Sequence, residues 1–162
     1  MMIMAIEHGI QRVEYSAHDV ANWFLNYNYQ LRELEGEDTD DISNLKLQKL
    51  LYYAQGCFLA IKNRALFNDE IVAWKHGPVV KEVYFEFKNY GSSGIKNPEQ
   101  EELKKFDDDT DALLRQVYEV FGKYSAWGLR ELTHKEAPWK NTPQGSVIKT
   151  DLIKDYFKEN YV

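Results

Sequence analysis

The chain has 162 residues, of which 44% are hydrophobic and 28% are charged, a composition that predicts one globular domain and excludes an intrinsically disordered chain. Its 20 lysines and arginines against 26 aspartates and glutamates give a net charge of −6, which argues against non-specific binding to nucleic acid or to anionic lipid. The net charge would attract a basic partner, although solubility alone also explains it.

The sequence shows neither a membrane span nor a secretory signal. No stretch approaches the roughly 20 consecutive apolar residues of a membrane helix, and residues 1–10 have no basic segment followed by an apolar block. The single cysteine, Cys57, cannot form an internal disulfide and is typical of a reducing compartment. We therefore expect a cytoplasmic protein with no membrane partner and no nucleic-acid partner.

The first helix is expected to begin after a loosely ordered lead-in of residues 1–15, so that residues 16–162 form the domain. Ser16 and Asp19 have the spacing of a capping box, in which two side chains satisfy free backbone donors at a helix start. Apolar residues then recur at three- and four-residue steps, which predicts one buried helical face. These residues are Val20, Trp23, Phe24, Tyr27, Leu31 and Leu34.

A second helix is predicted over residues 44–62, after an acidic stretch at 36–41 that we expect to be a solvated loop. Ser43 or Asn44 can cap it by accepting hydrogen bonds from its free N–H groups. Its apolar residues lie on more than one side, as Tyr52 and Tyr53 fall outside the main stripe. A helix of this kind is usually packed by several neighbours, so residues 44–62 are predicted to be the core helix.

The middle of the chain predicts a short strand followed by a helix. Residues 71–74 are β-prone and follow a turn. Pro78 suits the first position of a helix, where its missing N–H would be unpaired anyway. The run 80–87 has apolar residues at helical spacing, and Gly91 is placed to end that helix. The same run is rich in Val, Tyr and Phe, so a strand is the alternative, but Pro78 favours the helix.

Two further helices are predicted in the last third of the chain. One begins near Asp109 or Thr110 and closes at Gly122, with acidic residues near its start that suit the helix dipole. Ser125 can cap a shorter helix that ends near His134.

The C-terminal segment is expected to return to the middle of the chain. Residues 137–139, Ala-Pro-Trp, predict an irregular segment, and Thr150 is expected to cap a final helix. Residues 147–148 could form a second short strand, and the run 146–149 is expected to pair with 71–74. The predicted fold is therefore mainly α (α+β), a compact bundle of five to six helices with one small two-stranded β element.

Motifs of enzymes and metal sites are missing from the sequence. There is no GxxxxGK[ST], GxGxxG, HExxH or GxSxG spacing, although residues far apart could still form a catalytic site. The four histidines are scattered and Cys57 is the only thiol, so we expect no metal and no cofactor. Cys57 lies in an apolar helical run, where burial raises a thiol's pKa and makes it inert. The remaining enzyme hypothesis is a hydrolase that uses His76 or His134 with a nearby acid.

Aromatic residues provide the other possible signal. Core packing explains most of them, but Trp and Tyr are also enriched among the residues that dominate protein interfaces. Trp74 stands beside a turn, and Trp139 follows a proline in a segment expected to be irregular. These two are candidates for a binding surface, with a core role as the alternative for each.

Three blocks of sequence together resemble the Panacea antitoxin domain, the SocA-like family that is also described as phage-associated GepA-like proteins. The blocks are KLQKLLYYAQ (46–55), AWKHGPV (73–79) and the pair AWGLRELTH (126–134) and APW (137–139). The resemblance covers roughly residues 17 to 158. Each block alone is weak, but their combination is specific.

The resemblance implies an antitoxin of a bacterial or phage toxin–antitoxin system that neutralises its toxin by direct protein–protein binding, without enzymatic activity. A family member that delivers its toxin to the ClpXP protease makes a proteolytic adaptor the alternative. The expected partners are the cognate toxin and, for the adaptor, a ClpXP-type protease. The candidate partner-binding residues, taken from the matched blocks and the aromatics, are Trp74, Lys75, His76, Tyr84, Trp127, His134 and Trp139.

Overall fold

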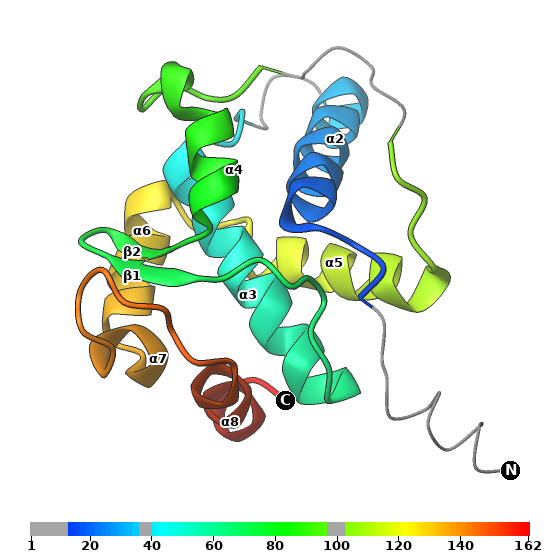
Figure 1. The fold of residues 1–162 in the computed structure, drawn as a ribbon. Helices are drawn as coiled ribbons and strands as arrows, with labels where there is room; N and C mark the ends of the chain where they lie inside the picture. Colours follow the sequence, from blue (N-terminus) through cyan, green and yellow to red (C-terminus); the bar gives the residue numbers. More distant parts are fainter. Residues whose placement is uncertain (1–12, 36–39, 97–102) are drawn as a thin grey trace, which may run out of the picture.

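The computed structural model describes residues 13–35, 40–96 and 103–162 (Figure 1). Within these ranges the chain forms seven α-helices, one short 3₁₀ helix and one antiparallel β-hairpin, so the prediction of a mainly α fold is confirmed. The predicted lead-in lies outside the described residues up to position 12, and the acidic loop lies outside them at positions 36–39.

Helix α3 (Asn44–Lys62) is the central helix. Four other helices pack against it: α2 (Ala17–Glu35), α5 (Asp108–Phe121), α6 (Ala126–His134) and α8 (Thr150–Asn160). The predicted range 44–62 is confirmed at both ends, and Ser43 is the cap, since its side chain accepts a hydrogen bond from the N–H of Lys46. The side chains of Tyr52 and Tyr53 are fully buried. The helix is therefore covered on several sides, as the apolar residues outside its main stripe predicted.

The capping box at the start of α2 is also confirmed. The N–H of Ser16 donates to Asp19 at 2.9 Å, and the N–H of Asp19 donates to the Ser16 hydroxyl at 3.1 Å. Val20 and Phe24 are fully buried, but Leu34, predicted on the same face, is almost entirely exposed. The apolar periodicity thus extends past the point where this helix leaves the core.

A β-hairpin replaces the helix that Pro78 was expected to start. Strand β1 (Val72–Trp74) pairs with β2 (Gly77–Val79), and Pro78 stands opposite Ala73. At that pair the N–H and C=O of Ala73 turn away, toward Ser146 and Gly145, so the missing N–H of proline costs no hydrogen bond in the hairpin. The predicted helix therefore begins later, at α4 (Lys81–Glu86), and a 3₁₀ turn, η2 (Lys88–Tyr90), follows it.

The expected pairing of 71–74 with 146–149 is present as a single β-bridge between Val72 and Val147. Two backbone hydrogen bonds flank it, from Ala73 to Ser146 and from Ile148 to Ile71. The partner of β1 in the sheet is β2 and not this segment. The link still fixes the chain just before the last helix to the hairpin, as predicted.

The remaining helices are α5 (Asp108–Phe121), α6 (Ala126–His134), α7 (Ala137–Lys140) and α8 (Thr150–Asn160). Asp107 and Ser125 cap α5 and α6 through their side chains. The prediction of an irregular segment at 137–139 was wrong, because Pro138 lies in the first turn of α7, where proline is tolerated. This one-turn helix explains why the structure has more helices than predicted.

The last helix begins one residue earlier than expected. Thr150 is its first residue and not its cap, and Lys149 at the cap position makes no side-chain hydrogen bond. Ile153 and Phe157 are buried against α3. None of the described helices is both long enough and apolar enough to cross a lipid bilayer.

Candidate functional site

Polar side chains on α3 form hydrogen bonds with the backbone of the hairpin and of α4. The Lys49 ammonium donates to the carbonyl oxygen of Pro78 at 3.0 Å, and the N–H of Val80 donates to the Gln48 side chain at 2.9 Å. Asn44 donates to the carbonyl oxygen of Tyr84 at 3.0 Å. Asn44, Gln48 and Lys49 are all buried. Gln48 and Lys49 of the KLQKLLYYAQ block, and Asn44 just before it, therefore position the backbone of the hairpin and of α4. This role explains why polar residues occur within a core helix.

Helices α6 and α7 fix the turn of the hairpin from one side. His134 Nε2 lies 2.9 Å from the carbonyl oxygen of Lys75, and its Nδ1 lies 2.6 Å from that of Arg130. Trp139 donates its indole N–H to the carbonyl oxygen of Trp74 at 2.7 Å. The His134 and Trp139 rings meet edge to face with centroids 3.9 Å apart. Backbone groups of the turn, which belongs to the second matched block, are thus anchored by side chains from both parts of the third block.

Arg130 links the turn to the exposed end of α6. Its Nε donates to His76 Nδ1 at 3.0 Å, and its guanidinium lies 4.2 Å from the centre of the Trp127 ring, a cation–π distance. His76 is exposed, yet desolvation of its ring and the positive charges of Arg130 and Lys75 lower its pKa. This shift and the hydrogen bond that its Nδ1 accepts from Arg130 both favour the neutral imidazole.

The arrangement of the two histidines does not favour the hydrolase hypothesis. In the described parts of the chain, neither His76 nor His134 forms a hydrogen bond or ion pair with a carboxylate. A general base of the usual kind is oriented by an acid. Among these same residues, no group of three or more His, Cys, Asp and Glu side chains could hold a metal ion. Burial raises the pKa of the Cys57 thiol to about 12, which makes it a poor nucleophile.

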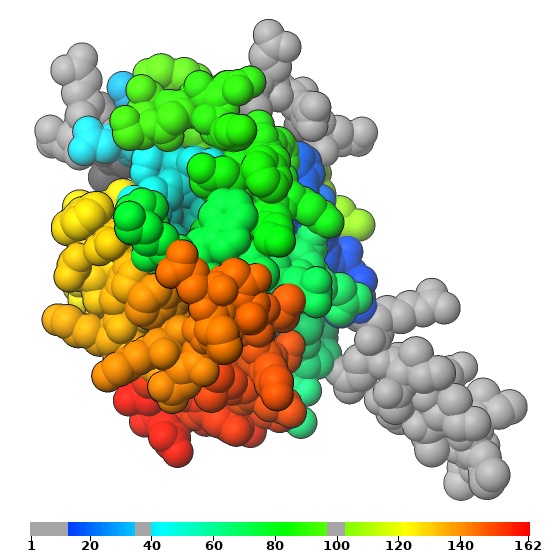
Figure 2. All heavy atoms as spheres, turned by 60° about the vertical axis from the view of Figure 1, so that its left-hand side comes forward, coloured from blue at the N-terminus to red at the C-terminus, as the bar shows by residue number. Residues whose placement is uncertain are grey.

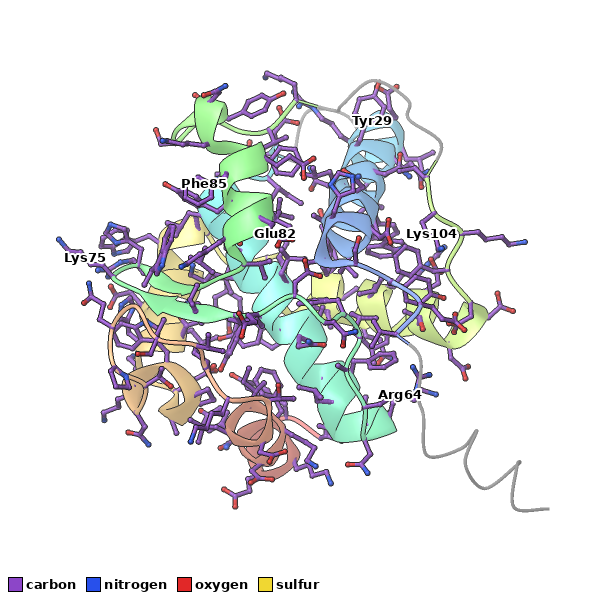
Figure 3. All side chains as sticks on the ribbon, in the orientation of Figure 1. Tyr29, Arg64, Lys75, Glu82, Phe85 and Lys104 are labelled. Carbon is purple, nitrogen blue, oxygen red and sulfur yellow. The ribbon has the colours of Figure 1, made fainter. Side chains whose placement is uncertain are left out.

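Aromatic side chains surround the hairpin and leave an exposed surface. Trp74 packs edge to face on Tyr84, with centroids 5.0 Å apart, and its ring lies 6.2 Å from that of Phe85. Phe85, on α4, is 56% exposed, and Trp127, on α6, is 58% exposed. Figure 3 shows Phe85 on the outer side of α4 and Lys75 at the tip of the hairpin. We call Trp74, Tyr84, Phe85, Trp127 and Trp139 the aromatic face.

A cleft of about 510 Å³ opens beside the aromatic face. Figure 2 turns this side forward and shows the cyan start of α3 at the bottom of a hollow between green segments. The cleft lies among the start of α3, the hairpin, α4 and the turn after it. Its lining residues are Asn44, Leu45, Gln48, Trp74, Lys75, His76, Val79, Tyr84, Lys88, Gly91, Ser92 and Gln144.

The structure brings the seven candidate residues into one region. Trp74, Lys75, His76 and Tyr84 line the cleft, and His134, Trp139 and Trp127 hold or flank the same turn.

Sequence reasoning missed Phe85, Lys88 and Arg130. Phe85 could have been found because it is an aromatic residue outside the apolar stripe of its helix. Arg130 could have been found because it lies three residues after Trp127, a spacing that places the two side chains on the same helix face. Lys88 had no signal in the sequence, because its role depends on where the cleft lies.

A buried carboxylate lies beneath this region. Glu136 is almost fully buried and accepts hydrogen bonds from the hydroxyls of Tyr52 and Tyr53, at 3.0 Å each, and from Tyr161. Burial raises the pKa of Glu136, and the three hydroxyls oppose that shift. The cluster joins α3, the start of α7 and the end of the chain. Its groups are satisfied by one another, so its role is to hold the helices together.

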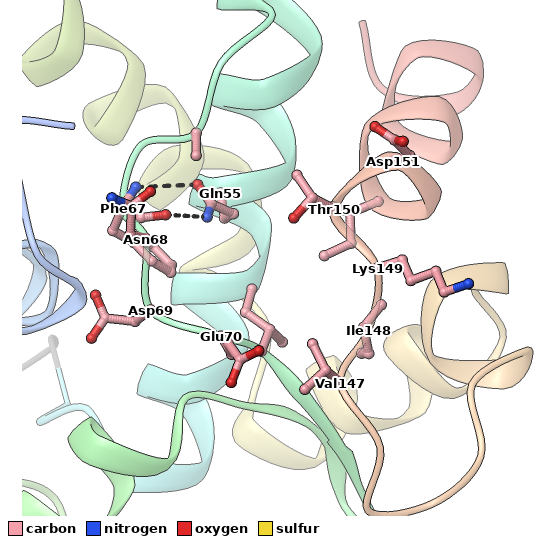
Figure 4. A pocket seen from close by; sticks show the side chains of 13 residues that line it. Gln55, Phe67, Asn68, Asp69, Glu70, Val147, Ile148, Lys149, Thr150 and Asp151 are labelled. Carbon is pink, nitrogen blue, oxygen red and sulfur yellow. Dashed lines mark hydrogen bonds between the residues drawn. The ribbon is translucent and has the colours of Figure 1, made fainter. Parts of the chain in front are cut away.

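A second cleft, also about 510 Å³, lies on the other side of the hairpin, between the loop 65–71 and the start of α8 (Figure 4). Its rim carries Asp69, Glu70 and Asp151. Gln55 at its base is already paired with the backbone of Phe67 at 2.7 Å and that of Leu66 at 2.8 Å. Every buried side-chain nitrogen and oxygen of the described residues has a hydrogen-bond partner, so neither cleft contains an unpaired buried polar group. We favour the cleft at the aromatic face as the candidate site because Trp74 and Tyr84 line it, and aromatic residues of this kind are enriched at protein interfaces.

Comparison with known proteins identifies the family of the chain. A family model described as "Antitoxin SocA-like, Panacea domain" matches residues 47–140, a range that contains most of α3, the hairpin and the whole aromatic face. The curated protein "Antitoxin SocA" of Caulobacter vibrioides (strain NA1000 / CB15N) is 35% identical over 139 residues, which cover 72% of this chain and 72% of that protein. No solved structure matches the chain significantly. The chain therefore belongs to the antitoxin SocA-like family with a Panacea domain.

Proposed function

We propose that this antitoxin neutralises its toxin by binding it directly, and that the toxin docks on the aromatic face. The observation that carries the proposal is that Phe85 and Trp127 are both mostly exposed and each lies beside a side chain of the turn region, Phe85 beside Trp74 and Trp127 beside Arg130, which contacts His76. Large aromatics and arginine are enriched among residues that dominate protein interfaces. Here Arg130 lies against Trp127 in the same surface.

The rigidity of the turn supports the same proposal. His134 on α6 and Trp139 on α7 contact the carbonyl groups of the turn, and Lys49 on α3 donates a hydrogen bond to β2. A surface that is already ordered loses little conformational entropy when a partner binds. Affinity can therefore come from a small number of aromatic contacts.

Co-expression with the cognate toxin tests the proposal. The unchanged protein should restore growth and co-purify with the toxin, and the double variant Phe85→Ala/Trp127→Ala should lose both effects. Tyr29→Ala is the matched control, because Tyr29 is also an exposed aromatic, 39% exposed, but lies on α2, away from the hairpin (Figure 3). Absence of a complex with the unchanged protein, or equal loss with Tyr29→Ala, would contradict the proposal.

A host strain without the ClpXP protease separates blocking from delivery. Direct neutralisation predicts that growth is still restored and that the toxin level does not change. If growth stops in that strain while the complex still forms, the protein acts as an adaptor for proteolysis.

A further inference from the structure

The charge of the cleft at the aromatic face is opposite to that of the whole chain. The chain carries a net charge of −6, yet none of the twelve described residues that line the cleft is Asp or Glu, and two of them, Lys75 and Lys88, are cations. The net charge alone would predict a basic partner. The local charge at the site predicts the reverse.

The cations of the cleft are available to a partner. In the described ranges, neither Lys75 nor Lys88 forms an ion pair. Lys88 lies over the ring of Phe85 at 5.9 Å. Two acidic residues on the adjoining helices have partners of their own, Glu86 with His18 at 2.6 Å and Glu131 with Arg130 at 2.9 Å.

The walls of the cleft are apolar, and its polar base is already satisfied. Trp74, Tyr84, Leu45 and Val79 form the walls. At the base, Gln48 bonds to Asn44 at 2.9 Å and to the Val80 backbone. The volume of about 510 Å³ is within the range of roughly 300–1,000 Å³ that is usual for ligand sites. The interior therefore suits an apolar or aromatic group that brings no polar atoms of its own.

We propose that this cleft binds a short segment of the toxin in which an aromatic side chain is flanked by acidic residues. The aromatic ring packs against the cleft-facing surfaces of Trp74 and Tyr84, and the carboxylates pair with Lys75 and Lys88 at the rim. This inference rests on the proposed function, since it names the chemistry of the toxin surface that the antitoxin recognises. A partly desolvated pair of opposite charges also sets the orientation of the bound segment.

Charge reversal tests the acidic part of the inference. The dissociation constant for the purified toxin is measured for the unchanged protein, for Lys75→Glu/Lys88→Glu, and for Lys104→Glu as a control. Lys104 is exposed on the opposite side of the molecule from Lys75 (Figure 3). The double variant should bind at least tenfold more weakly, and the salt dependence of its affinity should be reduced. Lys104→Glu should bind as the unchanged protein does.

Filling the cleft tests the aromatic part. Ser92 is exposed and lines the cleft, and its neighbour Ser93 is exposed but does not line it. Ser92→Trp should reduce affinity at least tenfold, whereas Ser93→Trp should change it little. Circular dichroism and melting temperatures confirm that all variants are folded.

Overlapping 15-residue peptides that tile the toxin identify the bound segment. Peptides retained by the unchanged protein and lost with Lys75→Glu/Lys88→Glu should contain an aromatic residue within a few positions of Asp or Glu. If the toxin binds and neither the charge reversal nor Ser92→Trp weakens it, or if the retained peptides are basic, this inference is wrong and direct neutralisation stands. If the toxin does not bind the unchanged protein, the proposed function itself fails.

Discussion

The side-chain nitrogen of Lys49 lies 3.0 Å from the carbonyl oxygen of Pro78, at a position where the lysine is completely buried. This contact joins the core helix to the second strand of the hairpin. Burial and the positive charge of Arg130 lower the pKa of Lys49 to about 7. Burying a charged amine without an acidic partner costs free energy. Because its pKa is about 7, about half of the Lys49 side chains are neutral near pH 7.

The free energy of unfolding should rise with pH between about 7 and 8.5. In the unfolded chain the lysine regains its ordinary pKa near 10.4 and keeps its proton through this range, while in the folded protein it loses the proton above pH 7. Unfolding therefore takes up a proton, and stability increases by about 1–2 kcal/mol over the window. Chemical denaturation at pH 7.0, 7.5, 8.0 and 8.5 measures the effect.

Lys49→Met is the control for this pH dependence, because it keeps the length of the side chain and removes the titrating group. Its unfolding free energy should change little over the same window. The range stops at pH 8.5 because burial raises the pKa of Cys57 to about 12. Above its ordinary pKa near 8.5 the thiol ionises only in the unfolded chain, which lowers stability and offsets the contribution of Lys49. An equal slope in both proteins would assign the pH dependence to another group.

Trp127→Ala and Trp74→Ala should separate binding from folding. The Trp127 side chain is mostly exposed, so its removal should cost about 2 kcal/mol of binding free energy, roughly 30-fold in affinity, with the melting temperature unchanged. Trp74 is half-buried against Tyr84, and its loss should reduce both quantities. Calorimetry with the toxin and thermal melts of the free protein measure them. Trp127 would be structural if its replacement lowered only the melting temperature.

Glu136→Leu should destabilise the protein by about 3 kcal/mol or more. The change leaves the hydroxyls of Tyr52, Tyr53 and Tyr161 without their acceptor, and each unpaired buried polar group costs about 1–3 kcal/mol. Tyr161→Phe removes only one donor, from a less buried side chain, and should cost about 1 kcal/mol. Urea denaturation compares the two. A smaller loss for Glu136→Leu than for Tyr161→Phe would show that the cluster does not stabilise the fold.

Helix positions could be predicted well from the sequence because their signals are local. The helix caps and the range of α3 depend on residues a few positions apart. The structure confirms the cap at Ser125 and the range of α3, and of the two candidates Ser43 and Asn44 it has Ser43 as the cap. The hairpin could not be predicted, because Pro78 is compatible with both a helix start and a strand. The strand is stabilised by residues that are distant in the sequence. These contacts are the hydrogen bond from Lys49 on α3 and the hydrogen bonds of Ala73 with residues 145 and 146.

The residues of the candidate site were predicted from other signals, namely the matched sequence blocks and the aromatic residues. Apolar periodicity does not show which of these blocks lie together in space. Phe85 and Lys88 lie between two matched blocks, so they were missed although the structure places them at the site. The charge of the cleft could not be anticipated either, because it opposes the net charge of the chain.

Gly56→Ala should destabilise the protein although alanine is the better helix former. A Cβ at this position in α3 would lie 2.4 Å from ring atoms of Phe157, which is fully buried on α8. Overpacking of this kind costs about 1–3 kcal/mol, more than the roughly 1 kcal/mol of helix propensity that alanine gains.

In the background of Phe157→Leu the clash is relieved, so Gly56→Ala should there be neutral or stabilising. A double-mutant cycle by urea denaturation measures the coupling, which should favour the double variant by at least about 1 kcal/mol. Additive effects would mean that the close packing of α3 on α8 does not depend on the absence of a side chain at Gly56.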